Sequence, residues 1–128
     1  MKEIAKNEYY ELAVDEAKNR VYWTMKGFWK SMSVVPDFDK DWDTTQSLVK
    51  SGFTLFGDLS KLGAMPDDVK LAQDERQKKL LESGCSKVSC LMDSVITKLT
   101  LNRALKGSGM DEILQYFDNT AEAEQWLN

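Results

Sequence analysis

The sequence contains no histidine among its 128 residues. This absence removes the side chain that most often serves as a general base, a metal ligand or a proton switch near neutral pH. The two cysteines, Cys85 and Cys90, are spaced too widely for a CxxC redox or zinc pair. We expect both to be structural free thiols, and we expect the protein to hold no metal and no cofactor.

The motifs of common enzyme classes are also missing. There is no G-x-S-x-G nucleophile elbow and no glycine-rich phosphate loop with its lysine. Asp67 and Asp68 form the one acidic pair at an expected junction of loop and helix, so they are the remaining candidates for acid–base catalysis. Adjacent acids at a helix start usually cap the helix. The sequence therefore favours a protein that is not an enzyme.

Charge and hydropathy exclude further classes of partner. The formal net charge of -4 argues against general binding of nucleic acid or of an anionic membrane surface. No apolar run approaches the roughly 18 residues that a membrane span needs. Residues 1–7 carry two lysines with no apolar stretch behind them, which is not the pattern of a signal peptide. We expect a cytoplasmic protein with a single domain over residues 1–128.

Hydrophobic patterning predicts five strands. Tyr9–Val14 and Arg20–Met25 are rich in aromatic and β-branched residues and form a hairpin around the charged turn Asp15–Asn19. Short apolar runs predict the others. These further strands are Phe53–Phe56, Lys87–Met92 and Ile113–Phe117. We place Phe53–Phe56 at the centre of the sheet.

Helix signals fall between and after these strands. Start and stop residues predict helices that begin near Pro36-Asp37 and end before Gly52, and at Asp67–Ser83, Ser94–Lys106 and Asn119–Leu127. The element order is β-β-α-β-α-β-α-β-α. It predicts an α/β fold with a mixed sheet of four or five strands, an N-terminal hairpin and about four helices.

Two stretches around the first helix have two possible interpretations each. The aspartates of the helix start, at positions 37, 39, 41 and 43, resemble a metal cluster, but helical spacing spreads them around the axis. We interpret them as solvated partners of the helix dipole. The connection before the helix is unusually apolar, with Phe28, Trp29, Met32, Val34 and Val35. It is either a lid that completes the core around Trp23 and Trp42 or an exposed patch for a partner or ligand.

The central stretch also resembles a known family. Asp58-Leu59-Ser60 follows the expected strand Phe53–Phe56, and a short loop then leads to a helix start at Pro66-Asp67-Asp68-Val69. This resembles the signature of the STAS domain (sulfate transporter and anti-sigma factor antagonist), in which Asp-Leu-Ser leads to an Asp-Ser-Ser-Gly turn. The ending Tyr116–Leu127 resembles the closing helix of bacterial STAS/SEC14-like proteins. In element order the likeness covers Tyr9–Leu127.

The resemblance implies a non-catalytic regulatory module that binds a protein partner through Asp58, Ser60, Asp67 and Asp68. In the antagonist family a serine pair carries a phosphorylation switch, whereas Asp67 and Asp68 occupy those places here. Aspartate cannot accept a phosphoryl group from a serine kinase, so we expect an unswitched docking site. The SEC14-like label and the apolar connection imply an alternative, a carrier or sensor of an apolar small molecule or lipid.

Overall fold

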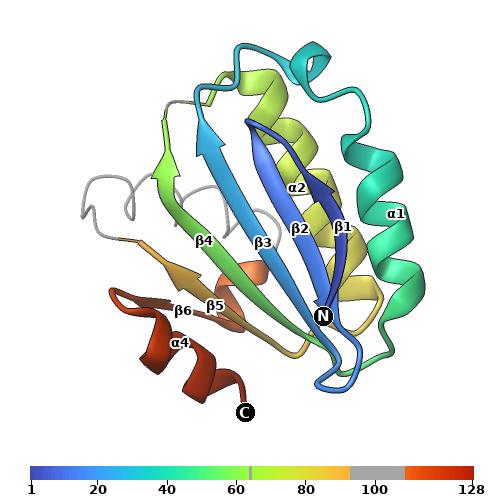
Figure 1. Cartoon of the computed structure of the whole chain (residues 1–128), viewed down its shortest axis with the longest axis vertical. Helices are drawn as coiled ribbons and strands as arrows, with labels where there is room; N and C mark the ends of the chain where they lie inside the picture. Colours follow the sequence, from blue (N-terminus) through green and yellow to red (C-terminus); the bar gives the residue numbers. More distant parts are fainter. Residues whose placement is uncertain (64, 93–108) are drawn as a thin grey trace.

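The chain forms a six-stranded mixed sheet whose spatial order follows the sequence. The computed structural model describes residues 1–63, 65–92 and 109–128 (Figure 1). The first three strands pair antiparallel, and the third to sixth pair parallel. The strands are β1 (Lys2–Lys6), β2 (Tyr10–Asp15), β3 (Arg20–Gly27), β4 (Thr54–Leu62), β5 (Lys87–Leu91) and β6 (Leu114–Phe117).

Helices cover the two faces of this sheet unequally. The α-helices of the described part are α1 (Phe38–Leu48), α2 (Asp67–Glu82) and α4 (Thr120–Leu127), with short 3₁₀ turns η1 (Met32–Val34) and η2 (Met110–Glu112). Helices α1 and α2 lie together on one side of the sheet, here called the inner face, and α4 lies on the other, the outer face (Figure 1). The larger core therefore lies between the sheet and α1 and α2.

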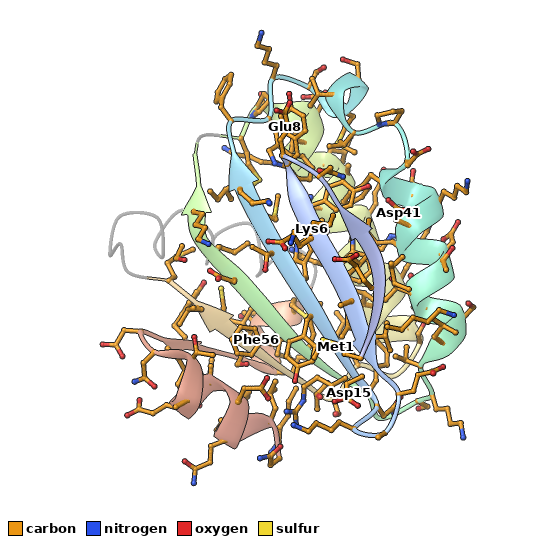
Figure 2. All side chains as sticks on the ribbon, viewed as in Figure 1. Met1, Lys6, Glu8, Asp15, Asp41 and Phe56 are labelled. Carbon is orange, nitrogen blue, oxygen red and sulfur yellow. The ribbon has the colours of Figure 1, made fainter. Side chains whose placement is uncertain are left out.

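Successive side chains of β4 point to opposite faces of the sheet and so enter different layers of the fold. Leu55 joins the inner core, while its neighbour Phe56 packs with Ala123 and Leu127 of α4 on the outer face (Figure 2). The inner core is strongly aromatic around Trp23. Its ring lies 5.0 Å from the ring of Trp42 and also contacts Tyr10, Trp29 and Phe38.

The number of strands was predicted wrongly. Segment Lys2–Lys6 forms an additional edge strand, which pairs with β2 from Lys2 opposite Val14 to Lys6 opposite Glu11. Its side chains are exposed or half-buried, so it lacks the apolar pattern that reveals a strand in a sequence. The helix predicted at Ser94–Lys106 lies outside the described residues.

The central place of β4 is confirmed, because it lies between β3 and β5. Its length differs from the prediction, which ended the strand at Phe56. Parallel pairing with β3 continues from Thr24 opposite Asp58 to Gly27 opposite Leu62, with a bulge between. Asp58 and Ser60 therefore belong to the strand and not to a loop.

The aspartates of α1 were expected to be solvated; Asp39 and Asp43 are indeed mostly exposed, but three of the aspartates also hold side-chain partners. Asp39 and Asp43 lie 3.0 and 3.1 Å from guanidinium nitrogens of Arg76, whose side chain is 2% exposed. Asp41 accepts a hydrogen bond from the Tyr10 hydroxyl. The sequence did not reveal these pairs because a lone arginine on a charged helix gives no sign that it is buried.

Helix α4 is held by a buried arginine as well as by apolar packing. The Arg20 guanidinium forms an ion pair with Glu124, donates to Asn128 Oδ1 at 2.8 Å, and donates from Nε to Thr54 Oγ1 at 3.0 Å. The predicted start of this helix is confirmed, since Asn119 Oδ1 accepts from the Glu122 amide at 2.8 Å. The last helix is thereby fixed to β3 and β4.

Removing the charge of Glu124 should destabilise the fold. Glu124→Gln leaves the Arg20 guanidinium buried with a weaker partner, and we expect a loss of about 2 kcal/mol of unfolding free energy in urea melts. Glu122→Gln is the matched control, because it removes the same charge from an exposed site on the same helix. It should cost only about 0.3–1 kcal/mol, from the helix dipole. Equal losses would show that the Arg20 pair contributes nothing.

Candidate functional site

Asp58 and Ser60 form a closed pair at the bulge of β4. Asp58 Oδ1 accepts from the Ser60 amide at 3.0 Å and from the Ser60 hydroxyl at 2.6 Å. Asp58 is two residues beyond Phe56 in a regular stretch of strand, so its side chain lies on the outer face. The acid and the hydroxyl satisfy each other, and their evident role is to fix the bulge.

Asp67 and Asp68 begin α2, but neither caps it as predicted. The N-cap residue is Pro66, and the helix has no side-chain capping bond. Asp68 Oδ2 instead accepts from the backbone amide of Met32 at 2.9 Å. Asp67 is exposed at the positive end of the helix dipole. The Asp68 carboxylate therefore ties the connection before α1 to the start of α2.

The four predicted docking residues do not form one surface. Asp58 and Ser60 lie on the outer face of the sheet, whereas Asp67 and Asp68 start a helix that covers the inner face. The sequence suggested one continuous loop because β4 was expected to end at Phe56. The extra residues of β4 carry Asp58 and Ser60 to the side of the sheet away from α2.

The apolar connection between β3 and α1 is a lid on the core. Trp29 is fully buried and Val35 is 4% exposed, while Met32 and Val34 are half-buried against the same cluster. Trp29 Nε1 donates to the backbone oxygens of Tyr9 and Lys26, both at 3.1 Å. Of the five residues proposed as a patch, only Phe28 is an exposed large apolar side chain, at 56%.

A second exposed apolar residue lies at the same end of the molecule. Leu71 is 60% exposed on the second turn of α2, one turn beyond Asp67. The Gly63 amide donates to the Gly27 carbonyl at 2.8 Å, which holds the residues after β3 beside the loop that leads into α2. We name Phe28, Asp67, Asp68 and Leu71 the α2-start surface.

Sequence reasoning missed Leu71 as a surface residue because it lies next to the apolar stripe of α2. The spacing of Leu71 from the core residues of α2 could have revealed its exposure. Leu71 lies two residues, about 200° around the helix, from the buried Val69. A residue at that angle from the buried Val69 points away from the core.

Two partly or largely buried groups have strongly raised pKa values. Burial raises the pKa of the Cys85 thiol to about 12, and it raises the pKa of Tyr116 to about 12. Both groups are therefore held in their neutral forms. Residues 1–63, 65–92 and 109–128 contain no group of three His, Cys, Asp or Glu side chains that could hold a metal ion. No helix within these ranges has the length and apolar character to cross a bilayer.

Trp29 and Phe28 are neighbours with opposite environments, and this gives a test of the lid. Trp29→Ala should cost about 3–5 kcal/mol of unfolding free energy, because it empties a large buried site and removes two hydrogen bonds. Phe28→Ala should change stability by less than about 0.5 kcal/mol. Urea melts of the two variants decide the matter, and similar losses would mean that the connection does not seal the core.

The cysteines should be unreactive in the folded protein. Cys85 and Cys90 are both buried free thiols, as the sequence predicted. With a pKa near 12, Cys85 is thiolate in roughly one molecule in ten thousand at pH 8. A chromogenic disulfide reagent should therefore report both thiols at once in denaturant and neither within the same time in buffer. Rapid titration of one thiol in buffer, lost in Cys85→Ser, would contradict this.

Comparison with known proteins concerns the fold. No family model matches the chain, and no curated protein matches it. The chain is similar to the crystal structure of an uncharacterised DUF3478-family protein with a SpoIIAA-like fold from Shewanella loihica PV-4. The TM-score is 0.72 at 8% sequence identity, and the match covers 97% of this chain and 98% of the other. The SpoIIAA-like fold is the STAS fold, so the chain has the fold that its central motif indicated.

Proposed function

We propose that the chain is a non-catalytic regulatory module that binds a protein partner through the α2-start surface. The observation that carries the proposal is the exposure of Phe28 and Leu71 at the end of the molecule where α2 begins with Asp67 and Asp68. Large exposed apolar side chains with a polar rim are typical of protein interfaces. In the described part of the chain, Met1 is the other exposed large apolar residue.

The Asp68 contact supports an unswitched site. A carboxylate is charged at neutral pH without any modification, and this one already holds the Met32 amide at 2.9 Å. In the antagonist family that the sequence resembles, serines at these places change their charge when phosphorylated. Aspartates supply a fixed charge instead, so the connection and α2 stay together without a kinase.

The non-catalytic part of the proposal rests on the chemistry of the groups with shifted pKa values. A nucleophile or general base needs a pKa near the working pH. Cys85 and Tyr116 shift away from that range, toward about 12. Ser60 bonds to a carboxylate that belongs to its own strand, with no imidazole anywhere in the sequence to activate it.

Removing the apolar pair should abolish partner capture. Phe28→Ser/Leu71→Ser replaces exposed side chains, so the melts should stay close to wild type. A partner retained from a lysate of the source organism by the wild type should be lost by this variant, because apolar anchors carry most of the binding energy in an interface. Glu75→Gln/Glu82→Gln is the control, since it changes two exposed residues farther along the same helix.

A second variant separates charge from packing. Asp67→Asn/Asp68→Asn keeps an oxygen acceptor for the Met32 amide and should change stability by at most about 1 kcal/mol. If the acids steer a basic partner, capture should weaken mainly through the association rate. Capture of the same partner in equal amounts by both α2-start variants and the control would reject the proposed surface.

A further inference from the structure

A cavity lies inside the inner layer, between the sheet and the helices α1 and α2. It has a volume of about 80 Å³. Its floor is the inner face of β3, β4 and β5, and α1 and α2 contribute its walls. Most of the side chains that line it are apolar, among them Trp23, Leu55 and Leu80. This space has no place in the docking function proposed above.

Gly57 lies in the floor of the cavity, in the middle of the central strand. Glycine inside a strand weakens it and often marks a site where another group approaches closely. A Cβ atom at Gly57 would meet only the Ser89 carbonyl oxygen, at 3.8 Å, which is ordinary contact. Neither crowding nor a left-handed backbone therefore requires glycine here. The lack of a side chain at Gly57 leaves open space above β4.

Three buried nitrogen atoms, which belong to residues that line the cavity, have no hydrogen-bond partner in the described part of the chain. They are Trp42 Nε1, Gln73 Nε2 and Arg76 Nε. The indole and guanidinium nitrogens can only donate, whereas the Gln73 amide can turn to present either end. Unpaired buried donors are costly and rare in native proteins. A hydrogen-bond acceptor that binds in the cavity is the simplest explanation for three such groups around it.

A water molecule in the cavity would pair poorly with the groups that line it. A water molecule that accepts from these donors must also place its own two hydrogens on acceptors. The rest of the wall is apolar apart from Gln77, which has an interaction of its own. A carbonyl oxygen accepts two hydrogen bonds and donates none, so it satisfies the donors without creating new unpaired groups.

The charge and size of the cavity further restrict the class of ligand that it can bind. The charge of Arg76 is already matched by Asp39 and Asp43, so the cavity has no net attraction for an anion. An apolar cavity of about 150 Å³ takes up benzene. At about 80 Å³ this one fits a smaller molecule and excludes a lipid chain. We infer that the cavity binds a small, neutral, mostly apolar molecule that carries a carbonyl oxygen.

Nuclear magnetic resonance of the whole chain tests this directly. The indole N–H signal of Trp42, identified by its loss in Trp42→Phe, should shift saturably when acetone is added. The probe 2-methylpropene has the same shape with a CH₂ group in place of the oxygen, and acetate is an anion of equal size. Both should bind at least about tenfold more weakly, since one lacks the acceptor and the other carries a charge that is not compensated.

Two variants link the binding to the cavity. Gly57→Ala fills part of the space, so it should raise the melting temperature and abolish the shift caused by acetone. Gln73→Met removes an amide of similar size and should weaken the binding of acetone roughly two- to tenfold while the protein stays folded. The inference is overturned if acetone gives no saturable shift, if either control probe binds as tightly, or if neither variant reduces binding.

Discussion

The buried guanidinium of Arg76 is the interaction on which the inner layer depends. It projects from the middle of α2 and binds Asp39, Asp43 and Gln46 of α1, so it joins the two helices that cover the inner face. Its side chain is 2% exposed, while the two carboxylates are mostly exposed. Burying a charge is costly unless partners compensate it, and here the partners fix how close and in what register the helices lie. The spacing of α1 and α2 in turn sets the walls of the cavity.

The parallel pairing of β3 with β4 is the second constraint, and it determines where polar side chains appear. Pairing continues through a bulge to Leu62, beyond the end of the apolar run. At that bulge, Asp58 and Ser60 form hydrogen bonds with each other. The extended strand also delivers the chain to Gly63, whose amide bonds to Gly27 and holds the lid beside α2. The pairing of β3 with β4 thus separates Asp58 from the acidic pair Asp67 and Asp68, although these residues look like one site in the sequence.

The order of the described strands and helices from Tyr9 onward could be predicted because local patterns determine it. Alternation in Arg20–Met25, the apolar run at Phe53 and the Asn119 cap each indicate their element without knowledge of the rest of the chain. The edge strand Lys2–Lys6 could not, since its stability comes from pairing with β2 and not from its own composition. The partners of Arg76 and Asp68 are separated from them by at least 30 residues in the sequence, so no local pattern contains them. For the same reason the candidate site was only partly predictable.

Helix α2 belongs to both candidate sites, and this relates them physically. Its first turn carries Asp68, which binds the Met32 amide, and Leu71 follows on the exposed side. Its middle carries Gln73 and Arg76, which line the cavity. A helix of this length is a stiff element, so a displacement of its middle is felt at its start within the same few turns. The lid and the cavity wall therefore both depend on contacts of α2, among them the ion pairs of Arg76 with Asp39 and Asp43.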